Sequence, residues 1–497
     1  MRFLLLTGAS LLAFATPAYA QEGGQPTQQT TTGDEVLSED IAESPTGGMI
    51  DTIVEDQAAA EAPPAPTGDP VLDRLNAMES RIRQLEARNA ELEQAAELNE
   101  GRLQSVETKT AKNVQFSWGP TFADTSGGFT FKPRGVIEAD YGAFFDRRGG
   151  YDYNNGTAFR RARIGFEGTA LKVFNYRIEV DFAGNAVALT DAYLQYKGLK
   201  NLLITAGQHK APFGLESNNS DNYNVFLERG MFTNAFGNVG AERRIGLSAA
   251  YAPKENINLA VGVFGDNESG SRSASAPDES WGFNGRATWE PIFDTGKILH
   301  LGASAFYRTE LKSGDTPDGI RLSDRPNIRI DNGNIADSGV ITGVESARYL
   351  GGEAAAVFGP LTLAGEYGRL WLDRPTLGDE AFDGFYAYAT FFLTGETRPF
   401  KGGNFDRVKP FTEVGKDGLG AFEVALRFDR LDLANTPVLG RIGNKAESLT
   451  LGLNWYLNAY SKLLFNWVRF NGTNTPLDPI GNRTKGDVIA TRLHVDF

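Results

Sequence analysis

The stretch Phe422-Glu-Val-Ala-Leu-Arg-Phe-Asp-Arg430 alternates apolar and charged residues with a period of two. Successive side chains of a β-strand point to opposite faces, so this pattern predicts a strand with one apolar face, made by Val424, Leu426 and Phe428, and one charged face. The segment 176–182 (YRIEVDF) repeats the pattern. A helix, whose period is 3.6 residues, does not produce it.

Runs of this kind recur from residue 129 to the C-terminus, and we mark off sixteen of them. Many are near the length that a tilted strand needs to cross a bilayer. Strand boundaries shift by several residues when one sequence is used, so counts of about fourteen or eighteen stay open as alternatives. The sixteen runs are 129–145, 159–170, 173–183, 187–198, 201–212, 243–253, 256–265, 281–290, 298–309, 347–358, 361–373, 382–394, 420–433, 447–458, 461–471 and 487–497.

The last run favours a membrane barrel over a soluble sandwich or propeller. It places Phe497 on one face with Leu493 and Ile489, and a chain that ends on an aromatic residue in an alternating strand resembles the outer-membrane assembly signal of Gram-negative bacteria. A sheet in lipid cannot leave an edge unpaired, so closure into a barrel is expected. Aromatic residues at strand ends agree with a membrane boundary: Trp289, Trp371, Trp455, Tyr456 and Trp467.

The first 113 residues form no part of this pattern. Residues 1–20 have the charged start, short apolar middle and small-residue end of a secretory signal peptide, too short for a membrane anchor. Residues 21–70 contain eleven acids and no Lys or Arg, which predicts a disordered acidic tether rather than a specific acidic ligand. Residues 71–112 carry a seven-residue apolar repeat that includes Leu75, Ile82 and Leu85, which predicts a periplasmic coiled coil. A lone amphipathic helix packed on another domain is the alternative. The barrel domain is expected over 114–497.

Composition narrows the function. The chain of 497 residues has no cysteine, so thiolate metal sites are not expected. Its three histidines lie on separate predicted strands, so a Ser-His arrangement is not expected either. We predict no enzyme, no catalytic or metal site, no cofactor and no nucleic-acid partner. No stretch after the N-terminus is apolar enough for a membrane helix. Of the net charge of −14, residues 1–113 carry −11 (+1 from Arg2, −11 from the tether, −1 from the coil), which leaves −3 for the barrel.

A sixteen-stranded barrel encloses a water-filled lumen, so passive transport is the expected function. Lumen charge sets ion selectivity, and the charged faces of the predicted strands point inward. Arginines suit oxyanions because each guanidinium offers several donors in a plane. Basic residues cluster at 159–163 and 242–244. The inward bases are Arg161, Arg163, Arg177, Lys197, Arg244, Arg286, Arg308 and Arg427; the inward acids, with which they could instead pair to stabilise the wall, are Glu167, Glu179, Asp181, Asp191, Glu353, Glu366, Glu423 and Asp429.

The long connection 217–241 mixes an Asn-rich start with the apolar stretch 225–232. Apolar loop residues need a surface to pack on, so we predict that this connection folds into the lumen and narrows it, with Arg229 near the narrowest part. A mobile extracellular loop is the alternative.

Several segments resemble the phosphate-selective porin O and P family of the bacterial outer membrane. They are Phe159-Arg-Arg-Ala-Arg163, Asp191-Ala-Tyr193, Gly207-Gln-His-Lys-Ala-Pro-Phe-Gly-Leu-Glu216, Phe226-Leu-Glu-Arg229, Phe392-Leu-Thr-Gly-Glu-Thr-Arg-Pro-Phe-Lys401 and Arg407-Val-Lys-Pro410. The resemblance implies a sixteen-stranded homotrimeric porin with an inward third loop and basic residues that guide anions. By motif it adds Lys210, Arg398 and Lys401 to the candidates. The segment 217–242 lacks the lysines on which phosphate selectivity in the family relies.

The sequence thus predicts an outer-membrane porin for small anions, with phosphate or related oxyanions suspected. The alternatives are a general or sugar-type diffusion porin and a structural protein that spaces the membrane from the cell wall. Expected partners are two further copies of the chain, outer-membrane lipid and small anions, with peptidoglycan as a further candidate for the N-terminal region. The anion-path candidates are Arg161, Arg163, Arg177, Lys210, Arg229, Arg244, Arg286, Arg398, Lys401 and Arg427.

Overall fold

The computed structural model describes residues 68–115, 119–124, 126–148, 151–265, 280–309, 319–416, 418–434, 444–473 and 483–497, without the side chains of 106–115 and 146–148. The predicted signal peptide (1–20) lies outside the described residues, and so does the predicted tether apart from its last three positions.

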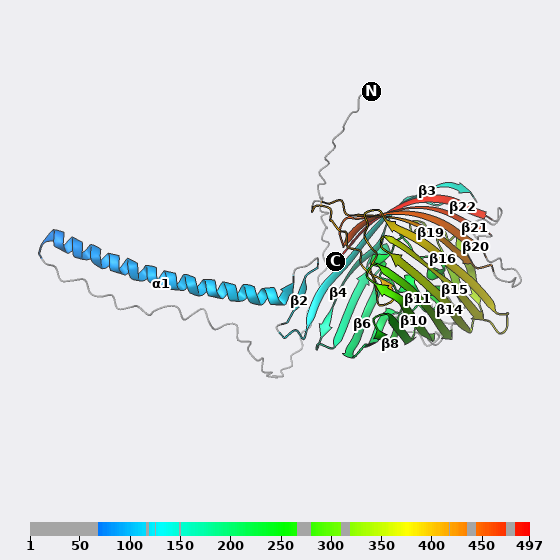
Figure 1. Cartoon of the computed structure of the whole chain (residues 1–497), viewed down its shortest axis with the longest axis horizontal. Coiled ribbons are helices and arrows are strands. Elements are labelled where there is room, and N and C mark those ends of the chain that lie inside the picture. Colours follow the sequence, from blue (N-terminus) through cyan, green and yellow to red (C-terminus); the bar gives the residue numbers. More distant parts are fainter. Residues whose placement is uncertain are drawn as a thin grey trace, which may run out of the picture. The chain divides into compact units, whose positions relative to one another are not determined.

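Residues 130–496 form a closed barrel of sixteen antiparallel strands, which confirms the predicted fold class. Each strand pairs with the next, and β22 returns to pair with β3, so that Val495 lies opposite Ile137. Figure 1 shows these tilted strands side by side, with β22 (red) next to β3. All sixteen predicted runs coincide with a strand of the barrel. The strands are β3 (Thr130–Arg148), β4 (Gly156–Ala170), β5 (Phe174–Asp181), β6 (Ala188–Leu199), β7 (Leu202–Lys210), β8 (Arg243–Lys254), β9 (Ile257–Phe264), β10 (Trp281–Asp294), β11 (Lys297–Thr309), β14 (Ser346–Phe358), β15 (Leu361–Asp373), β16 (Glu380–Phe392), β19 (Ala421–Asp432), β20 (Lys445–Tyr456), β21 (Ser461–Thr473) and β22 (Arg483–Asp496).

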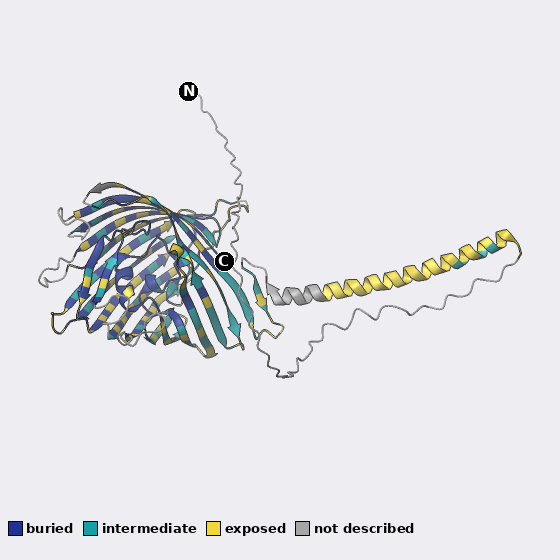
Figure 2. Ribbon diagram, turned by 180° about the vertical axis from the view of Figure 1, so that it is seen from behind, coloured by how far each residue is buried: buried dark blue, intermediate teal, exposed yellow. Residues whose placement is uncertain are grey.

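The outer face of the barrel is apolar, as a lipid-facing surface requires. Along most strands from β10 to β22, more exposed residues alternate with buried ones, which Figure 2 shows as alternating yellow or teal and dark blue bands. On β14 the outward Leu350 is exposed while the inward Tyr349 is buried. Two aromatic residues differ from the expectation. Trp467 lies in the middle of its strand (residues 461–473) and not at the end. Tyr456 points inward, where its hydroxyl donates to Glu423 at 2.9 Å, because the lumen supplies a partner that lipid cannot.

The connection between β7 and β8 folds into the barrel, as predicted. It contains α2 (Leu215–Asn218), the short helix η2 (Asp221–Tyr223) and α3 (Met231–Gly240). Side chains of the far wall hold its backbone: Arg427 Nη1 donates to the carbonyl of Glu228 at 2.8 Å, and Asn454 Nδ2 donates to that of Val225 at 2.9 Å. We call residues 211–242 the inserted loop.

The apolar side chains of the inserted loop pack on one half of the wall. Its aromatic residues stack against inward tyrosines of β14 and β16; the rings of Phe213 and Tyr349 lie 4.7 Å apart, and those of Phe232 and Tyr386 lie 6.0 Å apart. These contacts make the main apolar core of the molecule. Polar contacts also join the loop to β4, β8 and β22, and the rest of the inner wall from β3 to β9 lines open cavities.

Two further segments enter the lumen, and the sequence did not predict either. Between β11 and β14, the hairpin β12 (Gly319–Asp324) and β13 (Ala336–Thr342) buries Leu322 and Ile335 and touches α3, where Asn234 Nδ2 donates to Asp324 at 2.9 Å. Between β16 and β19, residues 393–420 carry the hairpin β17 (Phe400–Lys401) and β18 (Asn404–Phe405). We call this second segment the basic turn.

The basic turn and the inserted loop meet inside the barrel. Asn218 Nδ2 donates to Asn404 Oδ1 at 3.0 Å, and the backbone N–H of Phe405 donates to Asn219 Oδ1 at 3.0 Å. The two segments start from opposite ends of the strands, because antiparallel strands place alternate connections at opposite ends. The lumen is thus narrowed from both ends.

The remaining elements precede or join the strands. The helix α1 (Pro70–Asn113) confirms the predicted N-terminal helix, and apolar positions of its repeat, among them Leu75, Ile82 and Leu85, are exposed. One chain does not test the coiled coil, which stays a prediction. No helix in the described part of the chain is both long and apolar enough to cross a membrane. The short elements are β1 (Val114–Gln115) and β2 (Thr121–Ala123), which extend the sheet beside β3, and η1 (Ala183–Asn185).

Candidate functional site

A cavity of about 270 Å³ lies between the open inner wall, β3 to β8, and residues 218–222 of the inserted loop. We call it the charged cavity. Each strand contributes through its inward positions, which is why residues far apart in sequence meet here. Among the described lining residues the cations are Arg134, Arg163, Arg177, Lys210 and Arg243, and the carboxylates are Glu179, Asp191 and Asp221.

The cations that line the charged cavity are more exposed than the carboxylates that line it. The side chains of Arg177, Lys210 and Arg243 are 30%, 19% and 16% exposed. Those of Arg134 and Arg163 are 16% and 9% exposed, whereas the three lining carboxylates are 2% to 7% exposed. Glu167, which does not line the cavity, is 29% exposed and pairs with Arg134 at 2.7 Å and Arg177 at 2.6 Å. The water-facing surface is therefore mostly cationic.

Carboxylates of the wall hold the arginines of the charged cavity in place through ion pairs. Arg243 Nε donates to Asp191 at 2.8 Å, and Arg177 Nη1 lies 3.6 Å from the other oxygen of the same carboxylate. Arg163 Nε donates to Asp181 at 2.8 Å. Each guanidinium keeps further N–H groups beyond these pairs, since it carries five donors.

A glycine makes one of these pairs possible. Gly165 on β4 lies opposite Arg134 on β3 and Glu179 on β5. Because Gly165 has no side chain, Arg134 Nε comes within 2.8 Å of Glu179 across β4. A Cβ at this position would lie 2.3 Å from the carbonyl oxygen of Ile178, so alanine does not fit.

Asp221 joins the inserted loop to the wall. It accepts a hydrogen bond from Arg163 Nη1 at 3.0 Å and lies 3.2 Å from Arg161 Nε; within the loop it pairs with Arg229. Burial alone would raise the pKa of Asp221, but the neighbouring cations, Arg161 foremost, hold the pKa well below its usual range. The carboxylate therefore stays ionised at neutral pH and keeps the loop attached.

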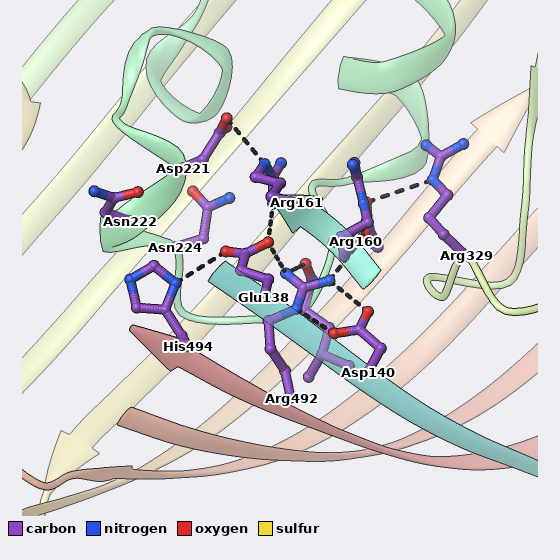
Figure 3. A network of polar contacts seen from close by, with 12 residues as sticks. Glu138, Asp140, Arg160, Arg161, Asp221, Asn222, Asn224, Arg329, Arg492 and His494 are labelled. Carbon is purple, nitrogen blue, oxygen red and sulfur yellow. Dashed lines mark hydrogen bonds and ion pairs between the residues drawn. The ribbon is translucent and has the colours of Figure 1, made fainter. Parts of the chain in front are cut away.

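A second network joins the inserted loop to β3, β4 and β22 (Figure 3). Arg492 makes two hydrogen bonds of 2.7 Å to Asp140 and a third of 3.0 Å to Glu228. Glu228 also accepts from Arg160 Nε at 2.6 Å. Burial would raise the pKa of Glu228, but Arg160 and its neighbours lower it well below the usual value. Glu228 belongs to the inserted loop, whereas Arg160 and Arg492 belong to strands of the wall, so these bonds anchor the loop to the wall.

A β-bulge brings Arg160 into that network. Glu138 lies opposite Arg161, while Ala139 lies opposite Phe159, so Arg160 is the extra residue. A bulge re-aims side chains at such a position. Strict alternation would have sent Arg160 to the lipid, and for that reason the sequence did not place it in the lumen. No sequence signal marks the bulge apart from the cost of an arginine in lipid.

Most of the predicted candidates are buried in ion pairs or carbonyl contacts. Arg161 pairs with Glu138 and Arg398 with Glu423. Arg229 pairs with Asp221 and donates to the carbonyl of Glu216 at 3.1 Å. Arg244 donates to the carbonyls of Asn238 at 3.1 Å and Val239 at 3.0 Å, and Arg286 donates to Glu353 at 3.1 Å and to the carbonyl of Gly403 at 2.7 Å. Arg427 donates to the carbonyl of Glu228 at 2.8 Å, and its guanidinium lies 4.6 Å from the ring of Phe226.

Four candidates lie elsewhere. Arg163, Arg177 and Lys210 line the charged cavity, and Lys210 Nζ donates to the carbonyls of Ser217 at 3.0 Å and Asn219 at 2.9 Å. Lys401 is exposed on the hairpin of the basic turn.

Three further lumen arginines were not among the predicted candidates: Arg134, Arg243 and Arg329. Arg134 has the same parity on its strand as the inward Glu138, so alternation could have found it. Arg329 comes from the unpredicted hairpin insertion and pairs with Asp324 at 2.9 Å. Among the described residues, no group of three or more His, Asp or Glu side chains could hold a metal ion.

A closed sixteen-stranded barrel with an apolar exterior and a charged, narrowed lumen is the architecture of an outer-membrane diffusion channel. The comparisons with known proteins agree. The family model described as phosphate-selective porin O and P matches residues 129–497, so the chain belongs to that family and lies in the bacterial outer membrane.

Two relatives illustrate the family. The chain is 32% identical over 398 residues to an uncharacterised protein of Caulobacter vibrioides, and the aligned region covers 77% of each chain. It is 29% identical over 427 residues to Porin O of Pseudomonas aeruginosa, which covers 77% of this chain and 92% of that one. Among solved structures, an anion-selective porin from Comamonas acidovorans shows 13% identity and a TM-score of 0.49, covering 74% of this chain and 99% of its own.

Proposed function

We propose that this channel passes small anions by passive diffusion, with phosphate and related oxyanions as the first candidates. The observation that carries the proposal is the arrangement of the charged cavity, in which five cations line the water and three carboxylates are recessed behind them. An anion in the cavity meets N–H donors first.

The candidates then divide into two roles. Arg163, Arg177 and Lys210, joined by Arg134 and Arg243, make the anion path. Lys401 adds an exposed cation on the basic turn. The buried bases position the inserted loop and the basic turn around that path; they are Arg161, Arg229, Arg244, Arg286, Arg398 and Arg427.

Phosphate is favoured by the kind of cation. Four of the five cations in the cavity are arginines, whose planar N–H groups match the oxygens of phosphate better than a lone ammonium does. Such contacts must stay weak enough for release, and the pairing of each arginine with a carboxylate weakens them.

We further propose that three copies assemble and that the N-terminal region is periplasmic, with residues 71–112 as a coiled coil behind the tether. The exposed apolar repeat of α1 supports this, because a helix with such a repeat buries it against other helices.

Current block in planar bilayers tests the anion proposal. Phosphate added at pH 7 to a channel carrying chloride should lower the single-channel current at concentrations where equal acetate does not. If phosphate and acetate block the current equally, the proposed preference for phosphate-like oxyanions is wrong. A preference of the channel for chloride over potassium would still support an anion channel.

A further inference from the structure

A second cavity, of about 610 Å³, adjoins the charged cavity inside the barrel. Lys210 and Asn218 line both cavities, so the two are neighbours across these side chains. Its walls are β6 to β10 on one side and the basic turn, at Gly402 and Asn404, on the other. A volume of this size is in the range of sites for small organic molecules, which is about 300–1,000 Å³.

The wall of the larger cavity carries an apolar patch that faces water. Leu203 on β7 lies opposite Ala250 on β8, and Ala250 lies opposite Ala260 on β9. All three have the inward parity of their strands, and Leu203 is 37% exposed. The inner positions of a water-filled barrel are normally polar. Three adjacent apolar positions there leave hydrocarbon exposed, which is unfavourable unless a ligand covers it.

Polar and basic groups flank the apolar patch. Asn258 and Thr288 lie beside it on β9 and β10, and Lys197, whose Nζ is 3.2 Å from Thr169 Oγ1, also lines the larger cavity. A ligand in this position therefore has an apolar patch, hydrogen-bonding groups at its edge and a cationic cavity next to it.

We propose that the channel takes organic anions that have one charged group and an apolar portion, such as alkyl or aryl carboxylates and phosphonates. The charged group occupies the charged cavity, and the hydrocarbon lies on Leu203, Ala250 and Ala260. Inorganic phosphate fills the charged cavity alone and leaves the apolar patch in water. This inference rests on the proposed anion path and adds the class of anion.

The test is block of the chloride current by straight-chain carboxylates from acetate to hexanoate at pH 7, with the full chain in planar bilayers. Burial of each added methylene should lower the half-blocking concentration by about twofold to fourfold. A series that is flat in chain length overturns the inference. So does an equal effect of uncharged alcohols of the same lengths, because then the charged cavity plays no part.

Variants assign the effect to the patch. Leu203→Asn combined with Ala250→Ser should reduce the gain per methylene to less than about 1.5-fold, while Ala387→Ser, on the outer face of β16, should leave it unchanged. If Leu203→Asn assembles poorly, Ala260→Ser serves instead. An unchanged gain in the patch variants overturns the inference. Cation preference in the wild-type channel would contradict the proposed function, whereas chloride preference with a flat series contradicts this inference alone.

Discussion

The most informative perturbation removes the two lining cations that share one carboxylate. Arg177 and Arg243 both contact Asp191, and both side chains face water. The charged cavity has five cations against three carboxylates, an excess of 5 − 3 = 2. Arg177→Gln lowers that excess to one, and the double variant with Arg243→Gln lowers it to zero. Glutamine keeps a donor and much of the side-chain length.

Coulomb's law gives the size of the effect. A permeating anion about 7 Å from the removed charge loses about 0.6 kcal/mol if the medium behaves as bulk water and about 2.4 kcal/mol at an effective dielectric constant of about 20. The lower value alone is a factor of about three in the occupancy of the cavity by anions. The single variant should therefore weaken anion preference, and the double variant should nearly abolish it.

The assay is the reversal potential of reconstituted channels under a tenfold gradient of KCl, where a channel permeable to one ion only gives about 59 mV. The control is Arg348→Gln, which removes the same charge from an outward side chain that is 57% exposed and paired with Asp373. The reasoning is refuted if the double variant keeps the wild-type reversal potential, or if Arg348→Gln changes it as much.

Three other predictions follow from the same contacts. Arg398→Met leaves Glu423 buried without its cation and should cost about 3–5 kcal/mol, seen as a lower unfolding temperature in detergent. Arg348→Met removes an arginine whose side chain is 57% exposed from a carboxylate, Asp373, that is 27% exposed, and should change stability by less than about 1 kcal/mol. Equal effects of the two variants would count against the burial argument. Gly165→Ala should reduce the yield of folded barrel, because the added Cβ has no room. Gly352→Ala, where no atom lies within 4 Å of the added Cβ, should not reduce it. Equal yields of the two variants would show that the strands around Gly165 can shift to make room. Deletion of residues 21–112 should leave single-channel conductance and ion preference unchanged and lower the oligomer fraction on native gels, and a change in conductance would show that this region contributes to the pore.

The barrel could be predicted because its cause is local. Each strand shows its inward and outward faces in its own residues, as in 422–430, and the final Phe497 closes the pattern. The inserted loop could be predicted as well, because apolar residues such as Phe226 and Phe232 had to be covered. These inferences need only the period of the chain and the cost of exposed hydrocarbon.

The division of the arginines into path and framework could not be predicted. Arg161 and Arg163 are two residues apart on one face, yet Arg161 is buried between Glu138 and Asp221 and Arg163 lines the charged cavity. The difference depends on how the inserted loop lies against the wall. Arg160 depends on a bulge, which alternation hides.

The position of the basic turn inside the lumen could not be predicted from the sequence either. Its sequence was linked to the family, but its position inside the lumen depends on partners far along the chain, such as the bonds between Asn404 and Asn218 and between Phe405 and Asn219. Contacts of that range leave no periodic signal in either segment.

The central claim is that anions pass between the cationic wall and the inserted loop. The measurement that tests it most directly is the reversal potential of the wild-type channel in a tenfold KCl gradient at pH 7. The structure predicts the sign and much of the size expected for chloride permeation, because the cations of the charged cavity outnumber its carboxylates and are more exposed. A reversal potential of the opposite sign, set by potassium, would contradict the account.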